Sequence, residues 1–116
     1  MTEADGSPPV ESDVEIFNDG DAHAYVVTVD GQRVGKAEYL IRDGRQVFFH
    51  TEVDEDRSGS GLASRLVRHA LDDVRSRKGR IVPLCPYVSA YIRRHPEYEE
   101  LVDHEMWTSM KTRLKR

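Results

Sequence analysis

The chain has 116 residues, with 17 basic and 21 acidic side chains and a formal net charge of −4. This length can bury one hydrophobic core but not two, so we expect a single domain. The mixed charges form no basic patch and no segment approaches the ~20 apolar residues of a membrane span, so we expect a soluble cytoplasmic protein that binds neither nucleic acid nor membrane.

The N-terminal residues 1–12 predict a disordered lead. They contain Gly6, Ser7, Pro8 and Pro9 together with acidic residues, and they offer little apolar surface to bury. We therefore expect residues 13–104 to form the domain and residues 105–116 to form a helical extension.

Three apolar segments that follow the lead predict an antiparallel meander. Residues 22–29 alternate like a half-buried strand, and residues 34–41 and 47–53 continue the pattern. Asp30-Gly31 and Asp43-Gly44 lie between them and supply the positive φ angles that short hairpin turns need. Strands joined by such short turns must be antiparallel.

The segment from Glu52 to Ser64 runs from the end of the last of these strands through a small-residue turn into an amphipathic helix. An apolar row four residues apart predicts the helix, and Gly79 ends it. Gly59 and Gly61 allow the backbone to approach a ligand closely, and the free N–H groups of a helix N-terminus can hold phosphate. The same two glycines could instead do no more than form a tight turn. The apolar row that predicts the helix consists of Leu62, Leu66, Ala70 and Val74.

The next apolar run, Ile81 to Cys85, predicts a short strand. A helical crossover places it parallel to the strand that ends at Val53. Pro83 cannot donate to a sheet ladder, so one side of this strand should be unpaired, as it would be at the sheet edge.

Beyond Tyr98, apolar residues recur at helical spacing up to the C-terminus. Such a stripe predicts a helix that packs on the domain, and docking of a partner is the alternative. The basic residues at its end complement the helix dipole. The stripe consists of Val102, Met106, Met110 and Leu114, with Trp107 near the same face.

Cys85, the only cysteine, can form no internal disulfide and precedes a predicted helix that begins at Pro86. It is either a small buried apolar residue or a thiolate favoured by the helix N-terminus and able to accept an acyl group. His50 ends an apolar strand and is either a general base or an exposed strand-end residue. On the residues alone, Tyr87 is a packed ring with a solvated hydroxyl. The histidines show no metal spacing, so we expect no metal site.

The stretch Ser58-Gly59-Ser60-Gly61-Leu62-Ala63 resembles the coenzyme A signature of the GNAT N-acetyltransferase superfamily, a Gln/Arg-x-x-Gly-x-Gly/Ala turn. Its fourth and sixth positions match, whereas Ser58 stands where the family has Gln or Arg, and the nearby cation is the displaced Arg57. The segments at residues 80–88, 94–98 and 50–53 resemble the short, single-cysteine branch of GNAT-like proteins, the small N-acetyltransferase domain-containing type. The resemblance covers residues 14–102.

This resemblance implies an α/β fold with an antiparallel meander, a cofactor-binding helix, a parallel fifth strand with an opening between it and the fourth, and C-terminal helices. It implies acetyl-CoA as cosubstrate and acetyl transfer to an amine, with an acceptor side open enough for a protein lysine or N-terminus. The alternative is a non-catalytic CoA-binding or protein-interaction module. The implied catalytic residues are Cys85, His50 and Tyr87. The implied cofactor-binding residues are Val53, Arg57, Ser58, Gly59, Ser60, Gly61, Leu62, Ala63 and Ser64.

Overall fold

The structure, a computed structural model, describes residues 13–57 and 59–114. The expected lead at residues 1–12 and the candidate residue Ser58 lie outside the described residues. The elements are β1 (Val14–Asp19), β2 (Ala24–Val29), β3 (Gln32–Arg42), β4 (Arg45–Val53), η1 (Glu55–Arg57), α1 (Leu62–Ser76), β5 (Ile81–Pro83), α2 (Pro86–Arg94), η2 (Pro96–Leu101) and α3 (His104–Leu114).

The five strands form one sheet in the order β1-β2-β3-β4-β5. The first four strands are antiparallel, and β5 lies parallel to β4 with Gln46 opposite Ile81 and Phe48 opposite Pro83. The expected α/β fold, with a meander and a parallel fifth strand, is confirmed. The strand β1 was not predicted from the residue pattern, and it adds an edge to the meander.

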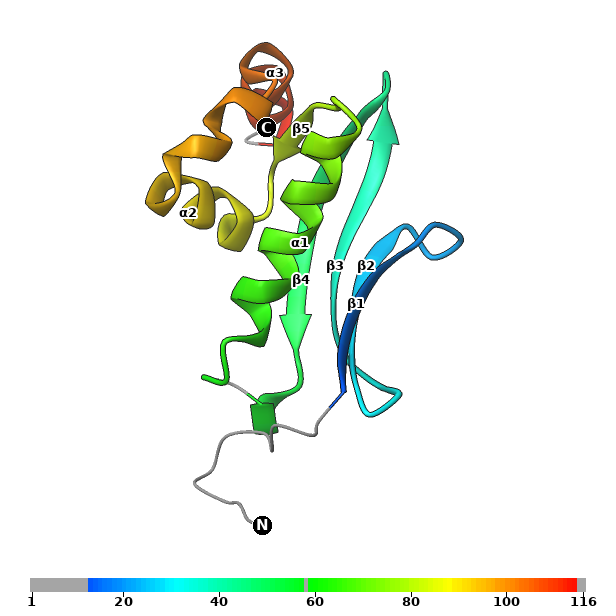
Figure 1. Ribbon diagram of the computed structural model, residues 1–116. Helices are drawn as coiled ribbons and strands as arrows, with labels where there is room; N and C mark the ends of the chain where they lie inside the picture. Colours follow the sequence, from blue (N-terminus) through cyan, green and yellow to red (C-terminus); the bar gives the residue numbers. More distant parts are fainter. Residues whose placement is uncertain (1–12, 58, 115–116) are drawn as a thin grey trace.

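Helices α1 and α2 cover one face of the sheet and leave the opposite face uncovered by either of them (Figure 1). The apolar row of α1 packs against large strand residues such as Tyr25 and Phe48, which are almost completely buried. On α1 the buried side chains recur every three or four residues, as an amphipathic helix requires. They are Leu62, Leu66, Val67, Ala70, Leu71 and Val74.

A β-bulge interrupts the pairing of β3 with β4. Glu38 pairs with His50 and Tyr39 pairs with Phe48, so Phe49 is an extra residue on β4. An extra residue reverses the alternation of side chains beyond it. Phe48 lies in the core under α1, and after the bulge it is Thr51, rather than His50, that lies on this helix-covered face.

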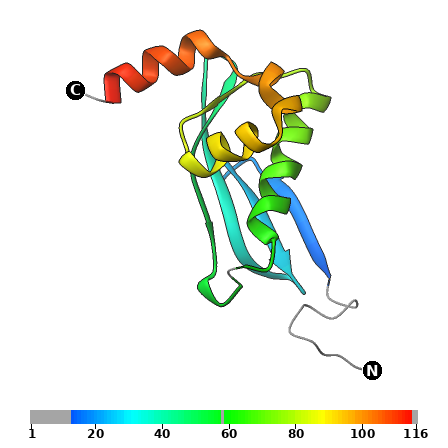
Figure 2. The ribbon, with the colours of Figure 1, turned by 90° about the vertical axis from the view of Figure 1, so that its left-hand side faces the viewer.

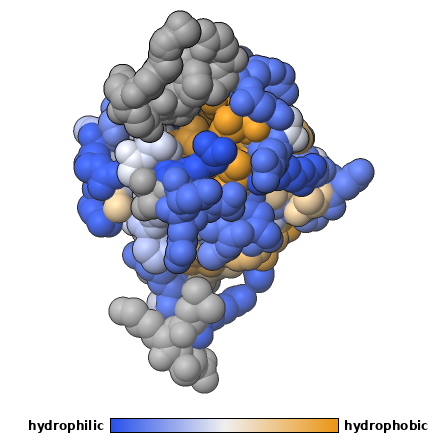
Figure 3. Space-filling model, turned by 90° about the horizontal axis from the view of Figure 1, so that it is seen from below, coloured by the Kyte–Doolittle hydropathy of each residue, from blue (hydrophilic) through white to orange (hydrophobic). Residues whose placement is uncertain are grey.

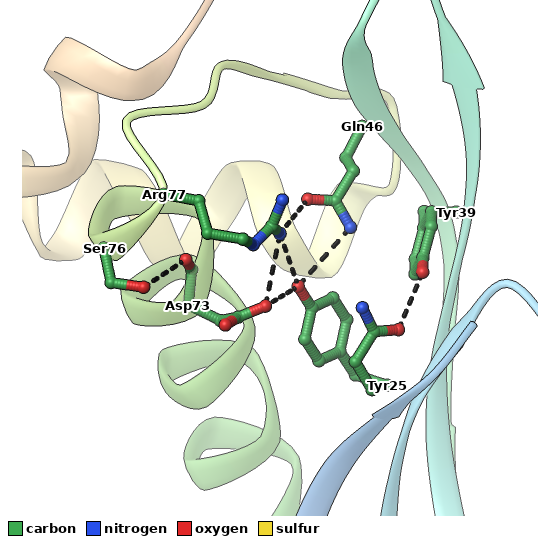
Figure 4. Close-up of polar contacts among 7 residues, drawn as sticks. Tyr25, Tyr39, Gln46, Asp73, Ser76 and Arg77 are labelled. Carbon is green, nitrogen blue, oxygen red and sulfur yellow. Dashed lines mark hydrogen bonds and ion pairs between the residues drawn. The ribbon is translucent and has the colours of Figure 1, made fainter.

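A polar cluster ties the C-terminal half of α1 to the sheet (Figure 4). Asp73 accepts hydrogen bonds from the Tyr25 hydroxyl and from the Arg77 guanidinium, and Arg77 also donates to Gln46 Oε1 at 2.9 Å. Burial, together with the hydrogen bond to Asp73, raises the pKa of Tyr25 to about 12. Burial raises the pKa of Asp73, but the hydrogen bonds from Tyr25 and Arg77 outweigh it and leave this pKa below its usual value.

Helix α3 begins at a polar junction and projects away from the body of the molecule (Figure 2). Asp103 accepts a hydrogen bond from the Met106 backbone N–H and forms an ion pair with Arg45 at 2.8 Å. Trp107 packs against the core, while Met106 and Met110 are half-buried. The helix is therefore attached mainly through its first turns.

Candidate active site

A cavity of about 520 Å³ lies where β4 ends and α1 begins. Seen from this end of the molecule, the surface is largely hydrophilic and frames an apolar area (Figure 3). The cavity is lined by Thr51, Glu52, Val53, Arg57, Gly59, Gly61, Leu62, Ala63, Ser64 and Tyr87. The structure thus brings together most of the residues for which cofactor binding was expected from the sequence.

The separation of β4 from β5 creates one side of this cavity. The two strands pair only from Gln46 to Phe48, and the Cys85 backbone N–H donates to the Phe48 carbonyl at 2.8 Å just beyond the last pair. The remaining part of β4, through Val53, has no partner in β5. The backbone groups on that side of β4 are left available to a ligand.

The turn before α1 has the conformation that its glycines predict. Gly59 and Gly61 have φ angles of 83° and 85°, a region that side chains disfavour. The first amides of any helix lack an intrahelical acceptor. In α1 the N-cap residue is Gly61, which has no side chain that could accept a hydrogen bond from these amides. These amides belong to Leu62, Ala63 and Ser64, all of which line the cavity.

Two other residues of the turn have distinct roles. Arg57 lines the cavity and forms no ion pair with a described residue, so its guanidinium is available to an anion. Ser60 does not line the cavity, and its hydroxyl donates to the Arg57 carbonyl at 2.6 Å. Ser60 therefore stabilises the turn.

Cys85 meets Thr51 at the opening between the two strands. The Cys85 side chain is only 3% exposed and occupies the N-cap position of α2. Its Sγ lies 3.4 Å from Thr51 Oγ1, and Thr51 itself lines the cavity. Thr51 thus connects the buried thiol with the cavity, a role that the sequence pattern did not reveal.

A comparison with family models gives a match over residues 24–101, to the family described as GCN5-related N-acetyl-transferase. The chain belongs to this family. The match contains the cavity, the opening between β4 and β5, and Cys85. A search among curated proteins finds no match.

Members of the GCN5-related N-acetyltransferase family transfer acetyl groups and generally use acetyl-CoA. The cavity has the donors that such a thioester needs, namely free helix amides and Arg57 for phosphate and an unpaired length of β4 for an amide-containing arm. Within the described residues, no three His, Cys, Asp or Glu side chains are grouped so as to hold a metal ion, and no helix has the length and apolar character to cross a membrane.

His50 lies away from Cys85, on the sheet face that α1 does not cover. Its Nε2 is 2.8 Å from Glu52 Oε1, and the imidazole is about half exposed. The hydrogen bond with His50 holds the pKa of Glu52 below its usual value. The structure therefore pairs Cys85 with Thr51 and His50 with Glu52, because the bulge at Phe49 directs the two pairs to opposite faces.

The two tyrosines of α2 are in different environments. Tyr87 is half-buried and lines the cavity. Tyr91 is buried, and its ring stacks on His95 with 4.2 Å between ring centroids. Burial raises the pKa of Tyr91. Of these two tyrosines, Tyr87 is the one that lines the cavity.

Proposed function

We propose that this chain is an acetyl-CoA-dependent N-acetyltransferase that acetylates an amine. The observation that carries the proposal is the continuous cavity from the first amides of α1 to Thr51 and Tyr87. In the proposed complex, the pyrophosphate occupies the turn at Gly59 and Gly61, and Arg57 supplies the positive charge that Ser58 cannot supply.

The pantetheine arm then follows the unpaired part of β4 and accepts and donates hydrogen bonds at the backbone of Val53. This direction leads the thioester toward Thr51 and Tyr87, beside Cys85. The separation of β4 from β5 supports this path, because a ligand amide can replace the missing strand partner.

Acetyl transfer requires a neutral amine nitrogen that attacks the thioester carbonyl carbon. The bond from that carbon to the CoA sulfur then breaks, and the departing thiolate takes up a proton. In our proposal the thioester reaches the opening between β4 and β5 from the cavity, and the acceptor reaches it from the sheet face on which His50 lies. There His50, hydrogen-bonded to Glu52, removes one proton from the acceptor ammonium, and the Tyr87 hydroxyl protonates the departing thiolate. The remaining proton that the attacking nitrogen loses restores the Tyr87 hydroxyl. The exposed position of His50 suits an acceptor on a polypeptide, a lysine or an N-terminus.

Cys85 offers a covalent version of the same transfer. The Cys85 thiol gives its proton to water and its thiolate attacks the carbonyl carbon; the bond from that carbon to the CoA sulfur breaks, and the departing CoA thiolate takes up a proton. The amine then attacks the acetyl thioester on Sγ, and the Cys85 thiolate leaves. The contact with Thr51, which lines the cavity, supports this route because it places Sγ next to the proposed thioester. This route predicts a protein thioester, which direct transfer does not form.

The test follows CoA release from acetyl-CoA in the presence and absence of a lysine-containing peptide. The proposal expects peptide-dependent release together with an added acetyl group on the peptide. His50→Gln should slow the reaction by ~10²-fold, a typical contribution of a general base. CoA binding without turnover on lysine or N-terminal amines would instead establish a non-catalytic CoA-binding module.

A further inference from the structure

A second cavity, of about 450 Å³, lies outside the candidate active site, between α2, α3 and the end of β5. Figure 2 shows α3 leaving the body while α2 lies across the sheet, so the two helices diverge on either side of this region. We call it the α2–α3 cleft. It is lined by Pro83, Leu84, Pro86, Ser89, Arg93, Trp107 and Lys111.

The cleft combines an apolar base with two cations. Lys111 Nζ lies 4.0 Å from the centre of the Trp107 ring, and the Arg93 guanidinium donates to Ser89 Oγ at 3.2 Å. Among the described residues, no carboxylate lines the cleft, and neither Arg93 nor Lys111 forms an ion pair. This is a local excess of positive charge on a chain whose net charge is −4.

The hollow on the opposite side of α3 differs from the cleft in its charges. The hollow there is lined by Arg42, Arg45 and Arg113, but also by Asp43, Asp103 and Glu105. Its charges are therefore matched within the chain, and Arg45 and Asp103 form an ion pair. Neither cation of the α2–α3 cleft has such a partner among the described residues.

We propose that the α2–α3 cleft binds an acidic segment of a partner polypeptide. Carboxylates of the segment pair with Arg93 and Lys111, and an apolar side chain between them packs on Trp107, Pro83 and Leu84. Tryptophan and arginine are the residues that most often dominate binding at protein interfaces. Two cations beside an apolar base fit a polypeptide better than nucleic acid, which needs a longer track of phosphate contacts.

This inference does not depend on acetyl transfer, and its test needs no CoA. Trp107 is the only tryptophan of the chain, so its fluorescence reports on the cleft directly. The probe is a short peptide of glutamates interrupted by leucines, with its termini blocked. Matched peptides carry glutamine or lysine in place of glutamate. The expected result is a saturable change in Trp107 emission with the glutamate peptide alone, and one that weakens as salt rises.

Two double variants distinguish binding of the peptide at the cleft from its attraction to the overall charge of the protein. Arg93→Glu with Lys111→Glu should weaken binding of a dye-labelled glutamate peptide about tenfold or more, since each attraction becomes a repulsion. Arg42→Glu with Arg113→Glu makes the same change in net charge on the other side of α3. This variant should alter binding of the glutamate peptide by no more than about twofold. Anisotropy of the label is measured, because Lys111 itself affects Trp107 emission.

Several results would overturn the proposal. One is binding of the glutamine peptide as tight as that of the glutamate peptide. Another is binding of a single-stranded oligonucleotide or of anionic vesicles that is tighter than binding of the glutamate peptide. A third is an equal loss of glutamate-peptide binding in the two double variants. A glutamate peptide that produces no saturable change at millimolar concentration also rules it out. Circular dichroism of each variant checks that the fold is kept.

Discussion

Thr51 and Cys85 face each other where β4 and β5 separate, with 3.4 Å between Oγ1 and Sγ. Thr51 reaches this position because the bulge at Phe49 turns it toward the helix-covered side of the sheet. The hydroxyl lines the cavity while the thiol lies just behind it. Any chemistry at Cys85 must therefore pass Thr51.

The first prediction concerns Cys85. If Cys85 accepts the acetyl group, Cys85→Ala should leave CoA affinity nearly unchanged while transfer falls by orders of magnitude. Because Sγ is buried, the variant should also lose on the order of 1 kcal/mol of unfolding free energy. Intact-protein mass spectrometry of wild-type protein with acetyl-CoA alone should show one acetyl adduct. Full activity in Cys85→Ala and no adduct would leave direct transfer as the mechanism.

The second prediction concerns Gly61, which has a φ of 85° and no neighbouring atom that a Cβ would meet. CoA at 100 times its dissociation constant should stabilise the wild-type fold by about 2.7 kcal/mol. Gly61→Val should abolish this gain, because the strained residue displaces the first amides of α1.

Gly44 provides the matched control for this variant. It has a φ of 78° and equal free space, but it lies in the turn between β3 and β4. Gly44→Val should cost a similar amount of stability, about 1–2 kcal/mol, and keep the full CoA shift. Equal CoA shifts in the two variants would place the ligand elsewhere.

The third prediction is a loss of stability at high pH. The pKa of Tyr25 is raised from 10.0 to about 12, mainly by burial, so its neutral form is favoured in the fold. Its contribution is complete below pH 10 and is lost as the pH rises toward 12, because the unfolded tyrosine releases its proton first. Tyr25→Phe should therefore flatten the decline of unfolding free energy over this range, measured by urea titration. An unchanged slope would show that Tyr25 is not held neutral.

The fourth prediction concerns α3. Truncation after Asp103 removes Trp107 from the core and the half-buried Met106 and Met110. The loss should be about 1–3 kcal/mol, the value of one well-buried apolar side chain, since α3 is attached mainly through its first turns. Thermal unfolding of the truncated and full chains measures this difference. Identical melting temperatures, together with rapid amide exchange in α3, would show that the helix contributes no packing.

The turn and helix of the cofactor site could be predicted because their signals are local. Gly59 and Gly61 specify the turn, and the row from Leu62 to Val74 specifies the helix that follows. The crossover through that helix was enough to predict a parallel strand, whereas the opening between the two strands was expected only from the family resemblance.

The arrangement around Cys85 could not be predicted, because it depends on pairing between distant segments. The bulge at Phe49 is visible only in the register of β3 against β4, and it exchanges the faces on which His50 and Thr51 lie. In the same way, the cluster of Tyr25, Asp73 and Arg77 joins residues about 50 positions apart, separated by 48 for Tyr25 to Asp73 and 52 for Tyr25 to Arg77. The roles of Cys85, His50 and Tyr87 remain predictions.

The most direct test of acetyl-CoA binding is a titration followed through the backbone amide resonances of ¹⁵N-labelled protein. Our account predicts saturable shifts concentrated at Val53, Gly59, Gly61, Leu62 and Ala63, because phosphate and pantetheine bond these amides. The amides around the α2–α3 cleft should move little. An absence of saturable shifts at millimolar acetyl-CoA, or shifts centred away from the start of α1, would contradict the account.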